Sequence, residues 1–349
     1  MCGIAGRMGL APVHAAAAAA LAEEMGAALR RRGPDGERAH HDADLLLVHR
    51  RLSIIDLSAA GAQPLWNEEG TVCVIVNGEI YNFRELRRSL QERSHRFRSG
   101  SDSEVLVHLY EDSGIEGCCR AIEGMFAFAL WDARTRDLFL VRDRLGIKPL
   151  VVAAHEAGVT FASTLSGLLT DPAVSPAMRE EALVAVLKWG FVPSPWSAVR
   201  AARRILPGTW LRLRGGRIVE ERRWWTDSPT TEPVADDDVR VAVVDAVRSH
   251  LIADVPVGAL LSAGIDSGIV TGLAARTRGP EHLEVWTASH RGHPEDELTE
   301  AVLAARHFGV RLHEVPVGGS GLTEARFARM LEAMDEPLAD ASLVALHEL

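Results

Sequence analysis

The sequence predicts two units of different fold class, an α+β sandwich followed by an α/β unit built on a parallel sheet. Up to about residue 210, strand patterns such as TVCVIVNGEIYN and FAFALWDARTRDLFLVRDR are interspersed with helical stretches such as NFRELRRSLQER. Beyond residue 238, helices alternate with short apolar strands such as VPVGALL and LEVWTAS. Mixed elements favour a sandwich with sheets as inner layers, whereas strand–helix alternation favours a doubly wound parallel sheet.

The chain of 349 residues is long enough for two cores, because single domains rarely exceed about 250–300 residues. We expect a first domain over 1–210, a connecting segment and linker over 211–238, and a second domain over 239–349. The linker candidate is SPTTEPVADDD, which is rich in Ser, Thr and Pro before an acidic run. Asp236–Asp238 precede a predicted helix, where carboxylates stabilise the positive helix end.

Composition excludes several classes of protein. The net charge of −10 offers no electrostatic reason to expect nucleic acid or an anionic membrane as a partner. No apolar run approaches the roughly 18 residues that a membrane span needs. The four cysteines have no disulfide or metal spacing, which favours a reducing cytoplasm. We therefore expect a cytoplasmic protein, and the sequence assigns no metal ligand.

The chain opens with MCGIAG, which places a thiol at residue 2. If Met1 is removed, Cys2 carries both a nucleophile and a free α-amine with a reference pKa of about 7.7–8.0. Near neutrality such an amine can accept the thiol proton, directly or through a water. A cysteine at this position has no function in most proteins, so the hypothesis depends on the rest of the chain.

Seven motifs accompany this cysteine in a fixed order over residues 1–210: MCGIAG, RRGPDG, HRRLSIIDLSAAGAQP, VNGEIYNFRELR, GSDSEVLVHLYEDSG, IEGMFAFALWD and LVRDRLGIKPL. Together they resemble the glutaminase domain of class II amidotransferases, specifically of the glutamine-hydrolysing asparagine synthetase family. The resemblance implies an N-terminal nucleophile sandwich with αββα layers. One departure is Arg31, which stands where relatives often carry His before RGPD.

The resemblance also implies roles for individual residues. Cys2 would be the nucleophile, and Asn77 and Gly78 would form the oxyanion hole through a side-chain amide and a backbone N–H. Arg51 suits the glutamine α-carboxylate through a forked, charge-assisted contact, and Asp102 would pair with its ammonium group. The implied glutamine-binding set is Arg51, Leu52, Ser53, Ile54, Ile55, Asn77, Gly78, Glu79 and Asp102.

In the second domain, LLSAGIDSG lies between a predicted strand and a predicted helix, a place that favours anions. It resembles the pyrophosphate-binding loop of ATP pyrophosphatases. The implied ATP-binding residues are Leu261, Ser262, Gly264, Asp266, Ser267 and Ala288. Ala263 stands where the family has glycine, and at positive φ its methyl group would cost about 1 kcal/mol or more. DEL and MDEPLAD also match relatives in order, although MDEP alone indicates a helix end before proline.

The resemblance implies that ammonia is released from glutamine at Cys2 and transferred to aspartate that Mg·ATP has adenylylated. ATP and Mg²⁺ would act as a substrate complex, and no tightly bound cofactor is expected. Glutamine, aspartate and ATP are thus the expected partners, and relatives are often homodimers.

Two alternatives stay open at this point. The chain could be a tailoring ligase that amidates another carboxylate, or a glutaminase whose synthetase half is inactive. The chain ends at ALHEL, whereas relatives continue with a second phosphate loop. We therefore expect a truncated synthetase domain, inactive alone or completed by a separate chain. The sequence does not reveal the acceptor, the oligomeric state or whether Met1 is removed.

Overall fold

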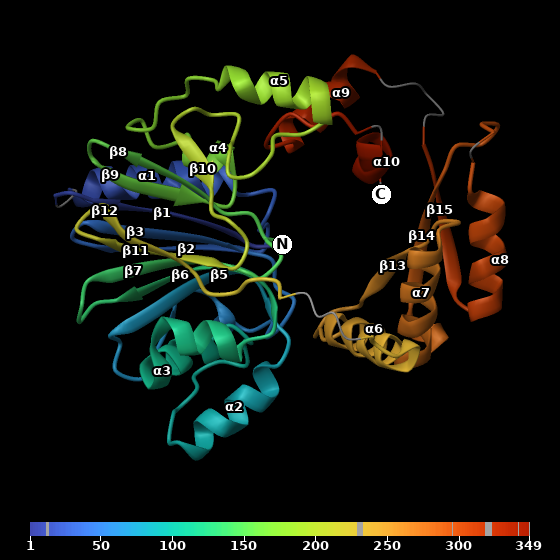
Figure 1. The fold of residues 1–349 in the computed structure, drawn as a ribbon, viewed down its shortest axis with the longest axis horizontal. Coiled ribbons are helices and arrows are strands. Elements are labelled where there is room, and N and C mark those ends of the chain that lie inside the picture. The colour runs from blue at the N-terminus through green and yellow to red at the C-terminus, as the bar shows by residue number, and fades with distance from the viewer. Residues whose placement is uncertain (12–13, 229–232, 295, 318–322, 341, 349) are drawn as a thin grey trace. The chain divides into compact units, whose positions relative to one another are not determined.

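The computed structural model describes residues 1–349 except 12–13, 229–232, 295, 318–322, 341 and 349 (Figure 1). The chain divides into two compact units. The first comprises Met1–Ser228 and Asp335–Ala339, and the second comprises Pro229–Met334 and Asp340–Leu349. Part of the expected linker, residues 229–232, lies outside the described residues.

Two antiparallel six-stranded sheets form the inner layers of the first unit. The first sheet has the order β10 (Ala202–Arg204), β8 (Val151–His155), β9 (Gly158–Ala162), β1 (Gly3–Gly9), β3 (Leu45–Arg51) and β2 (Gly36–Asp42). The second has the order β12 (Arg217–Arg223), β11 (Thr209–Arg214), β7 (Asp137–Arg142), β6 (Gly124–Asp132), β5 (Val72–Ile80) and β4 (Leu65–Trp66).

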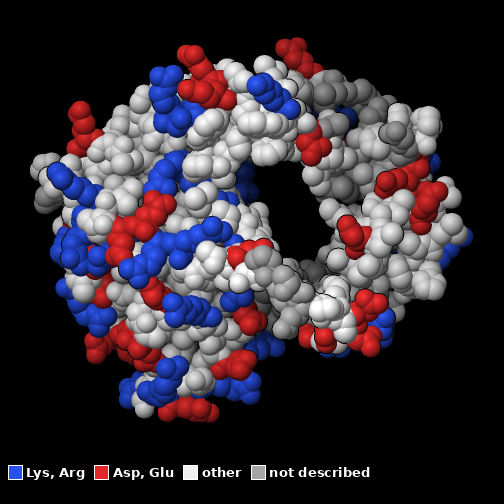
Figure 2. Space-filling model, in the orientation of Figure 1, with Lys and Arg blue, Asp and Glu red and all other residues white. Residues whose placement is uncertain are grey.

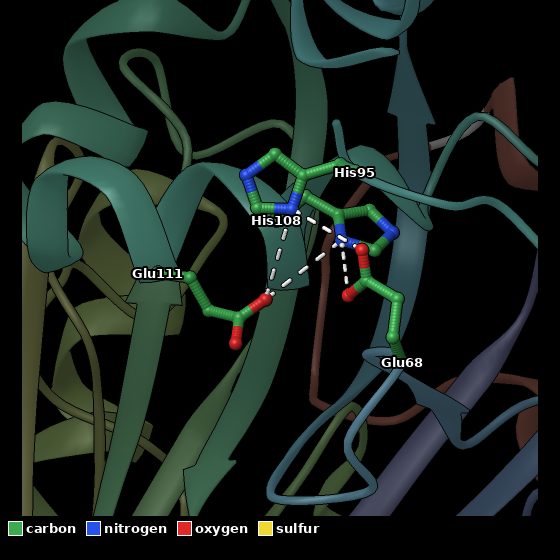
Figure 3. Close-up of side chains that lie close together, drawn as sticks. All are labelled: Glu68, His95, His108 and Glu111. Carbon is green, nitrogen blue, oxygen red and sulfur yellow. Dashed lines mark ion pairs between the residues drawn. The ribbon is translucent and has the colours of Figure 1, made fainter. Parts of the chain in front are cut away.

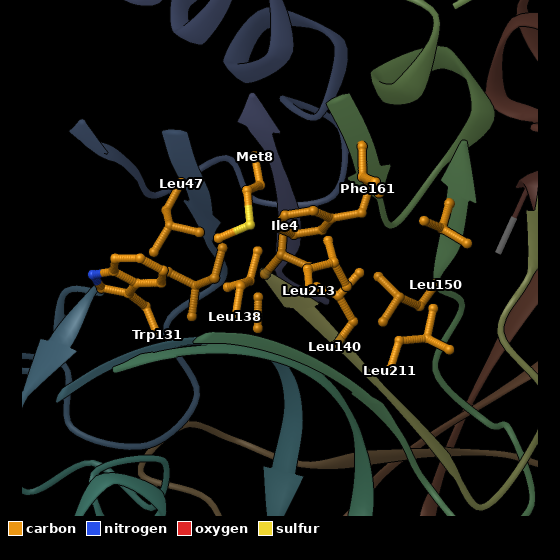
Figure 4. Close-up of a cluster of buried hydrophobic side chains, with 14 of the residues drawn as sticks. Ile4, Met8, Leu47, Trp131, Leu138, Leu140, Leu150, Phe161, Leu211 and Leu213 are labelled. Atoms are coloured by element: carbon orange, nitrogen blue, oxygen red, sulfur yellow. The ribbon is translucent and has the colours of Figure 1, made fainter. Parts of the chain in front are cut away.

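Alternation along the strands explains how the layers form. In β3, Leu45 and Leu47 enter the core between the sheets, whereas Leu46 and Val48 pack with the buried side chains of a helix. Successive side chains of a strand point to opposite faces, so an unbroken apolar run fills both. Figure 4 shows the core between the sheets, which includes Trp131 and Phe161. Each large side chain buried there contributes about 1.5–3 kcal/mol relative to exposure.

Helices cover the outer faces of both sheets (Figure 1). α1 (Ala15–Ala28) and α4 (Leu165–Leu168) contact the first sheet, while α3 (Val105–Ala121) contacts β5 and packs with α2 (Phe83–Glu92). α5 (Glu180–Trp189) and the short 3₁₀ turn η1 (Ala59–Gly61) complete this part of the unit. The αββα sandwich of the N-terminal nucleophile class is thereby confirmed.

The expected boundary at residue 210 falls inside β11. Residues of the expected connecting segment form the rest of β11 and all of β12, which pair as a hairpin on the edge of the second sheet. The hairpin turns at Gly215 and Gly216, both at positive φ. Glycine adopts this conformation without the steric cost that other residues meet. Two glycines between strand patterns are a hairpin signal in the sequence.

Asp335–Ala339 is the second segment of the first unit. The Asp335 carboxylate accepts the backbone N–H groups of Leu165 at 2.7 Å and Ser166 at 3.1 Å. The Ala339 N–H donates to the Gly190 carbonyl at 2.7 Å. α9 (Glu324–Ala333) ends just before this segment, so the helix end predicted at MDEP is confirmed.

The second unit has a parallel sheet in the order β13 (Gly258–Leu260), β14 (Glu284–Ser289) and β15 (Arg311–Pro316). Its helices are α6 (Asp236–His250), α7 (Ile265–Arg278), α8 (Leu298–Phe308), α9 and α10 (Ser342–Glu348), with the 3₁₀ turn η2 (Pro280–His282). Strands and helices alternate from β13 to β15, as the sequence predicted. Asp236–Asp238 form the first turn of α6, where their negative charges stabilise the positive end of the helix dipole.

Basic and acidic side chains are interspersed over the visible face of the first unit (Figure 2). Several form ion pairs at its surface, for example Arg203 with Glu221 and Arg212 with Glu220. Such exposed pairs each contribute little to stability. Within the part of the chain that the structure describes, every helix is too short or too polar to cross a lipid bilayer.

Candidate active site

A cavity of about 120 Å³ lies in the first unit next to the start of β1 and the ends of β3 and β5. Gly3 pairs with Arg50 in the antiparallel sheet, so the start of β1 and the end of β3 lie side by side at the same end of the sheet. The cavity lining includes these candidate residues: Cys2, Arg51, Leu52, Ile54, Ile55, Asn77, Gly78, Glu79 and Asp102. Ser53 is not among the lining residues, and its N–H donates to the Asp35 carboxylate at 2.8 Å.

Cys2 precedes β1, and its sulfur contacts the Leu52 backbone. Sγ lies 3.4 Å from the Leu52 nitrogen, which donates to it, and 3.6 Å from the Leu52 oxygen. Burial raises the pKa of the Cys2 thiol, and the Leu52 hydrogen bond only partly opposes this. Since the thiol is more strongly protonated than usual near neutrality, it needs a neighbouring proton acceptor to become a nucleophile.

Met1 occupies one side of the same cavity. Its sulfur lies 2.7 Å from the Lys148 ammonium nitrogen, and both residues line the cavity. Burial lowers the pKa of the terminal amine on Met1. A terminal amine in this environment is therefore neutral to a greater extent near pH 7 than an exposed one, as a proton acceptor must be.

Asn77 and Gly78 lie in β5 beside the cysteine. The side-chain amide of Asn77 forms two hydrogen bonds when it is oriented with its nitrogen toward Cys2. The nitrogen then donates to the Cys2 carbonyl at 2.8 Å, and the oxygen accepts from Arg32 Nη2 at 3.2 Å. Gly78 has φ +155, and a Cβ there would lie 2.1 Å from the Met125 carbonyl oxygen. Only glycine therefore fits where β5 passes β6 near Cys2.

Arg51 is held by the loop that follows β3. Its Nη1 donates to the Ser58 carbonyl at 2.8 Å, and its Nη2 donates to the Asp56 carbonyl. Asp56 has φ +56, and its carboxylate accepts from the Gly100 N–H at 2.7 Å. A guanidinium has five N–H donors, so these two contacts orient Arg51 and leave donors for a carboxylate ligand.

Asp102 is a buried carboxylate on the segment before α3. Its Oδ2 accepts from the Ile80 N–H at 2.7 Å, and its Oδ1 lies 3.4 and 3.3 Å from the hydroxyls of Ser101 and Ser103. Burial raises the pKa of Asp102, although these hydrogen bonds oppose the shift. The described residues that hydrogen-bond to this carboxylate are Ile80, Ser101 and Ser103, so a cation that enters the cavity would meet a carboxylate without a basic hydrogen-bond partner among them.

Other residues of this site were not predicted, and three of them contact Met1, Cys2 or β5 directly. Arg32 donates through Nε to the Cys2 carbonyl at 3.1 Å. Gln63 lines the cavity, and its side-chain oxygen accepts from the Val76 N–H at 2.6 Å. Lys148 contacts Met1 as described. Arg32 and Lys148 belong to the motifs RRGPDG and LVRDRLGIKPL, but their positions within those motifs carry no chemical signal of their own.

The second candidate site is the loop between β13 and α7. Ser262 and Ser267 hydroxyl oxygens lie 2.9 Å apart, and the Gly264 N–H donates to the Ser262 hydroxyl at 3.1 Å. Leu261 precedes them and donates its N–H to the Trp286 carbonyl of β14 at 2.8 Å. Asp266 lies in the first turn of α7. Ser262 and Ser267 thus join the two ends of the loop at the start of the helix.

Ala263 has no strained backbone. Among the described residues, positive φ outside glycine occurs at Ala43, Asp56, Ser94 and Arg136. The substitution of Ala for glycine in this loop therefore has no backbone cost of the kind expected for positive φ. The Ala263 N–H donates to the Glu297 carboxylate at 3.0 Å, so an anionic group already contacts this N–H. Ala288 lies outside the loop, in β14, where it pairs with Val315.

The two stacked antiparallel sheets with helices on their outer faces define the αββα fold of the N-terminal nucleophile class. Residues 1–225 match the family described as "Glutamine amidotransferase domain", and the chain belongs to this family. Residues 238–349 match the family described as "Asparagine synthase".

Curated relatives agree with these matches. "Asparagine synthetase B [glutamine-hydrolyzing]" of Escherichia coli (strain K12) is 34% identical over 308 residues, covering 84% of this chain and 50% of the relative. "Asparagine synthetase [glutamine-hydrolyzing] 2" of Bacillus subtilis (strain 168) is 37% identical over 294 residues, covering 79% of this chain and 39% of the relative. The resemblance seen in the sequence is thereby confirmed. The chain spans about half the length of these relatives.

A solved structure titled "Structure of the allosteric regulatory enzyme of purine biosynthesis" is similar in fold. The TM-score is 0.50 at 15% sequence identity, over 90% of this chain and 80% of that chain. At this identity the similarity extends to the fold alone.

Proposed function

We propose that the first unit hydrolyses glutamine to glutamate and ammonia with Cys2 as nucleophile, after Met1 has been removed. The observation that carries the proposal is the convergence of Cys2, Asn77, Gly78, Arg51 and Asp102 on one cavity. These residues come from four separate segments of the chain and supply a nucleophile, neutral donors, a cation and an anion. Amide cleavage on an α-amino acid needs all four kinds of group.

The chemistry begins with transfer of the Cys2 thiol proton to its own α-amine. The thiolate attacks the carboxamide carbon, and the carbonyl oxygen becomes an oxyanion that the Asn77 amide and the Gly78 N–H stabilise. The intermediate collapses with protonation of the leaving nitrogen, which releases ammonia and leaves a thioester. Water then hydrolyses the thioester to glutamate and regenerates the thiol. In the structure, the Asn77 amide donates to the Cys2 carbonyl, so this amide lies beside the residue that we propose as the nucleophile.

Recognition of the amino acid end of glutamine would fall to Arg51 and Asp102. The loop contacts of Arg51 fix the position of its guanidinium, which would bind the ligand carboxylate. The buried Asp102 carboxylate would pair with the ligand ammonium. Leu52, Ile54, Ile55 and Glu79 complete the lining. Ser53 does not line the cavity, so it would affect glutamine binding only indirectly, through its hydrogen bond to Asp35.

For the second unit we propose activation of aspartate by Mg·ATP as an acyl-adenylate, which ammonia converts to asparagine with release of AMP. The loop of Leu261, Ser262, Gly264, Asp266 and Ser267 would hold the phosphates, with Ala288 near the base. The regular backbone at Ala263 supports this assignment. Mg²⁺ would enter with ATP. A homodimer, or a separate chain that supplies further parts of the synthetase, is part of the same proposal.

The test compares two nitrogen sources in full-length protein. Wild type is expected to release glutamate from glutamine, and to release pyrophosphate from ATP and aspartate with either glutamine or ammonium. Cys2→Ala is expected to lose both glutamine-dependent activities and to keep the ammonium-dependent one, which serves as the folding control. Glutamate release by Cys2→Ala, or full activity of protein whose intact mass includes Met1, would refute the nucleophile assignment.

The same assay separates the alternatives. Pyrophosphate release with another carboxylate in place of aspartate would indicate a tailoring ligase. Glutamate release without ATP binding or pyrophosphate release would indicate a glutaminase with an inactive synthetase half.

A further inference from the structure

We propose that Glu68, His95, His108 and Glu111 form a structural binding site for a divalent transition-metal ion, with Zn²⁺ as the best match. Figure 3 shows these four side chains converging from three parts of the first unit. Glu68 lies in the turn between β4 and β5, His95 follows α2, and His108 and Glu111 are on α3. One ligand atom from each lies within 4.8 Å of the others. We call this set the His–Glu cluster.

The strongest single observation is His108. Its side chain is completely buried, and within the part of the chain that the structure describes neither ring nitrogen has a hydrogen-bond partner. A buried polar atom without a partner costs about 1–3 kcal/mol, so such atoms need an explanation. Nδ1 of His108 points into the cluster, 3.3 Å from Glu68 Oε2 and 3.8 Å from Glu111 Oε2. The Phe97 ring, 4.4 Å away between centroids, covers the imidazole.

His95 also directs Nδ1 into the cluster, 3.4 Å from Glu68 Oε1 and 4.0 Å from Glu111 Oε2. Its other nitrogen, Nε2, lies 3.0 Å from the Asp112 carboxylate. Because an ionised carboxylate can only accept, Nε2 carries the proton, and the lone pair of a neutral ring is then on Nδ1. Metal-binding histidines commonly have this arrangement, in which a carboxylate fixes the tautomer.

The two carboxylates are oriented in a similar way. Glu68 Oε1 accepts from the Arg96 N–H at 2.7 Å, and Glu111 Oε1 accepts from the Asn67 side-chain amide at 2.6 Å. His108 Nε2 faces Glu104 at 3.9 Å. Each of the four proposed ligands thus also has a polar neighbour outside the His–Glu cluster, as side chains that bind a metal commonly do.

Geometry and charge favour zinc over a harder ion. Bonds of about 2.0–2.1 Å in a tetrahedron separate the ligand atoms by roughly 3.3 Å, close to the shorter separations observed. Two imidazoles with two carboxylates suit Zn²⁺ and neighbouring transition metals, whereas Mg²⁺ and Ca²⁺ prefer oxygen ligands alone. Two neutral histidines and two carboxylates also neutralise a divalent ion. Four protein ligands complete the coordination, so the site would be structural.

The metal would connect the turn after β4, the segment after α2, and α3. Glu104, which faces His108, accepts from the N–H groups of Arg98 at 2.6 Å and Ser99 at 2.8 Å. It therefore holds the start of the segment that continues to Asp102. None of the four residues of the His–Glu cluster lines the cavity that contains Cys2.

The test is calorimetric titration of chelator-treated full-length protein with ZnCl₂, together with thermal melting. Wild type is expected to bind one Zn²⁺ per chain at this site and to melt at a higher temperature with zinc, because a ligand of the native state stabilises it. Glu68→Gln and His95→Asn each remove a ligand on a partly exposed side chain and are expected to abolish this binding. Asp112→Asn is expected to weaken it by about 10–100-fold.

Two matched controls locate the binding. Glu69→Gln changes the neighbouring exposed residue in the same turn and is expected to bind zinc as wild type does. Cys2→Ala is expected to keep the site, which excludes zinc on the nucleophilic thiol as its origin. Equal zinc binding by wild type and Glu68→Gln, or no binding and no change of melting temperature in wild type, would overturn the proposal. The cluster would then be a set of polar contacts without a metal.

Discussion

At the scale of single residues, burial sets the chemistry of the candidate site. It raises the pKa of both the Cys2 thiol and the Asp102 carboxyl, and it lowers the pKa of the terminal amine. Each shift favours the neutral form, because a charge loses hydration in the cavity. The thiol therefore depends on a neighbouring base, and burial leaves a larger fraction of the Met1 amine neutral near pH 7.

Asp102→Asn is expected to lower kcat/KM for glutamine by about 10–100-fold, the effect of losing a charge-assisted contact of about 1.5–3 kcal/mol. The loss should appear mainly in KM. In wild type the pKa of Asp102 is raised, so KM should increase as the pH falls through that pKa and the carboxylate becomes protonated. Steady-state kinetics between pH 5 and 8 would check this. A KM of wild type that depends on pH no more than that of Asp102→Asn would contradict the assignment.

At the scale of elements, the course of β5 past β6 determines the shape of the site. Gly78 is where β5 comes so close to β6 that no side chain fits. Asn77, one residue earlier, is completely buried and lies within hydrogen-bonding distance of the Cys2 carbonyl. The strand thus places the Asn77 amide beside Cys2, and Gly78 lines the same cavity.

Gly78→Ala is expected to destabilise the first unit by more than the roughly 1 kcal/mol that unfavourable φ alone costs, because the strands must also move apart. Glutaminase activity should fall as well. Gly70→Ala is the matched control, since Gly70 has φ +68 but no atom within 4 Å of an added Cβ. Thermal or denaturant melting of the two variants would test this. Equal loss of stability in both would show that contact with β6 is unimportant.

At the scale of the whole molecule, the chain contributes to the first unit twice. Glu336, on the second segment, accepts from the Ala198 N–H at 2.7 Å and forms an ion pair with Arg204. Its side chain is 10% exposed and that of Arg204 is 23% exposed. These contacts attach residues 335–339 to the sandwich, far along the chain from the rest of the unit.

Glu336→Gln is expected to loosen this attachment, since it removes the ion pair between Glu336 and Arg204. Hydrogen exchange of the Ala339 and Ala198 amides should become faster, whereas exchange in β5 should not change. Asp340→Asn, just beyond the segment, is the matched control and should leave these amides protected as in wild type. Unchanged exchange in Glu336→Gln would mean that the backbone contacts alone hold the segment.

The sequence by itself determined the fold class of each unit, the order of its elements and most residues that line the cavity. Alternating apolar residues and glycine-rich turns are local features that the sequence shows directly. The ordered motifs alone were enough to name Cys2, Arg51, Asn77 and Asp102 as candidate site residues. The boundary was predicted too early, because the Gly215–Gly216 hairpin was not recognised as part of the second sheet.

Only the tertiary structure decided which distant residues meet. It brought Arg32 to the Cys2 carbonyl and Lys148 to the cavity, and it moved Ser53 away from the cavity lining. It also joined Glu68 to His95 and His108, and it returned residues 335–339 to the first unit. Such contacts depend on how strand ends, turns and helix faces pack at long range. Residue type and local spacing do not specify that packing, since the same local pattern is compatible with many arrangements of neighbouring elements.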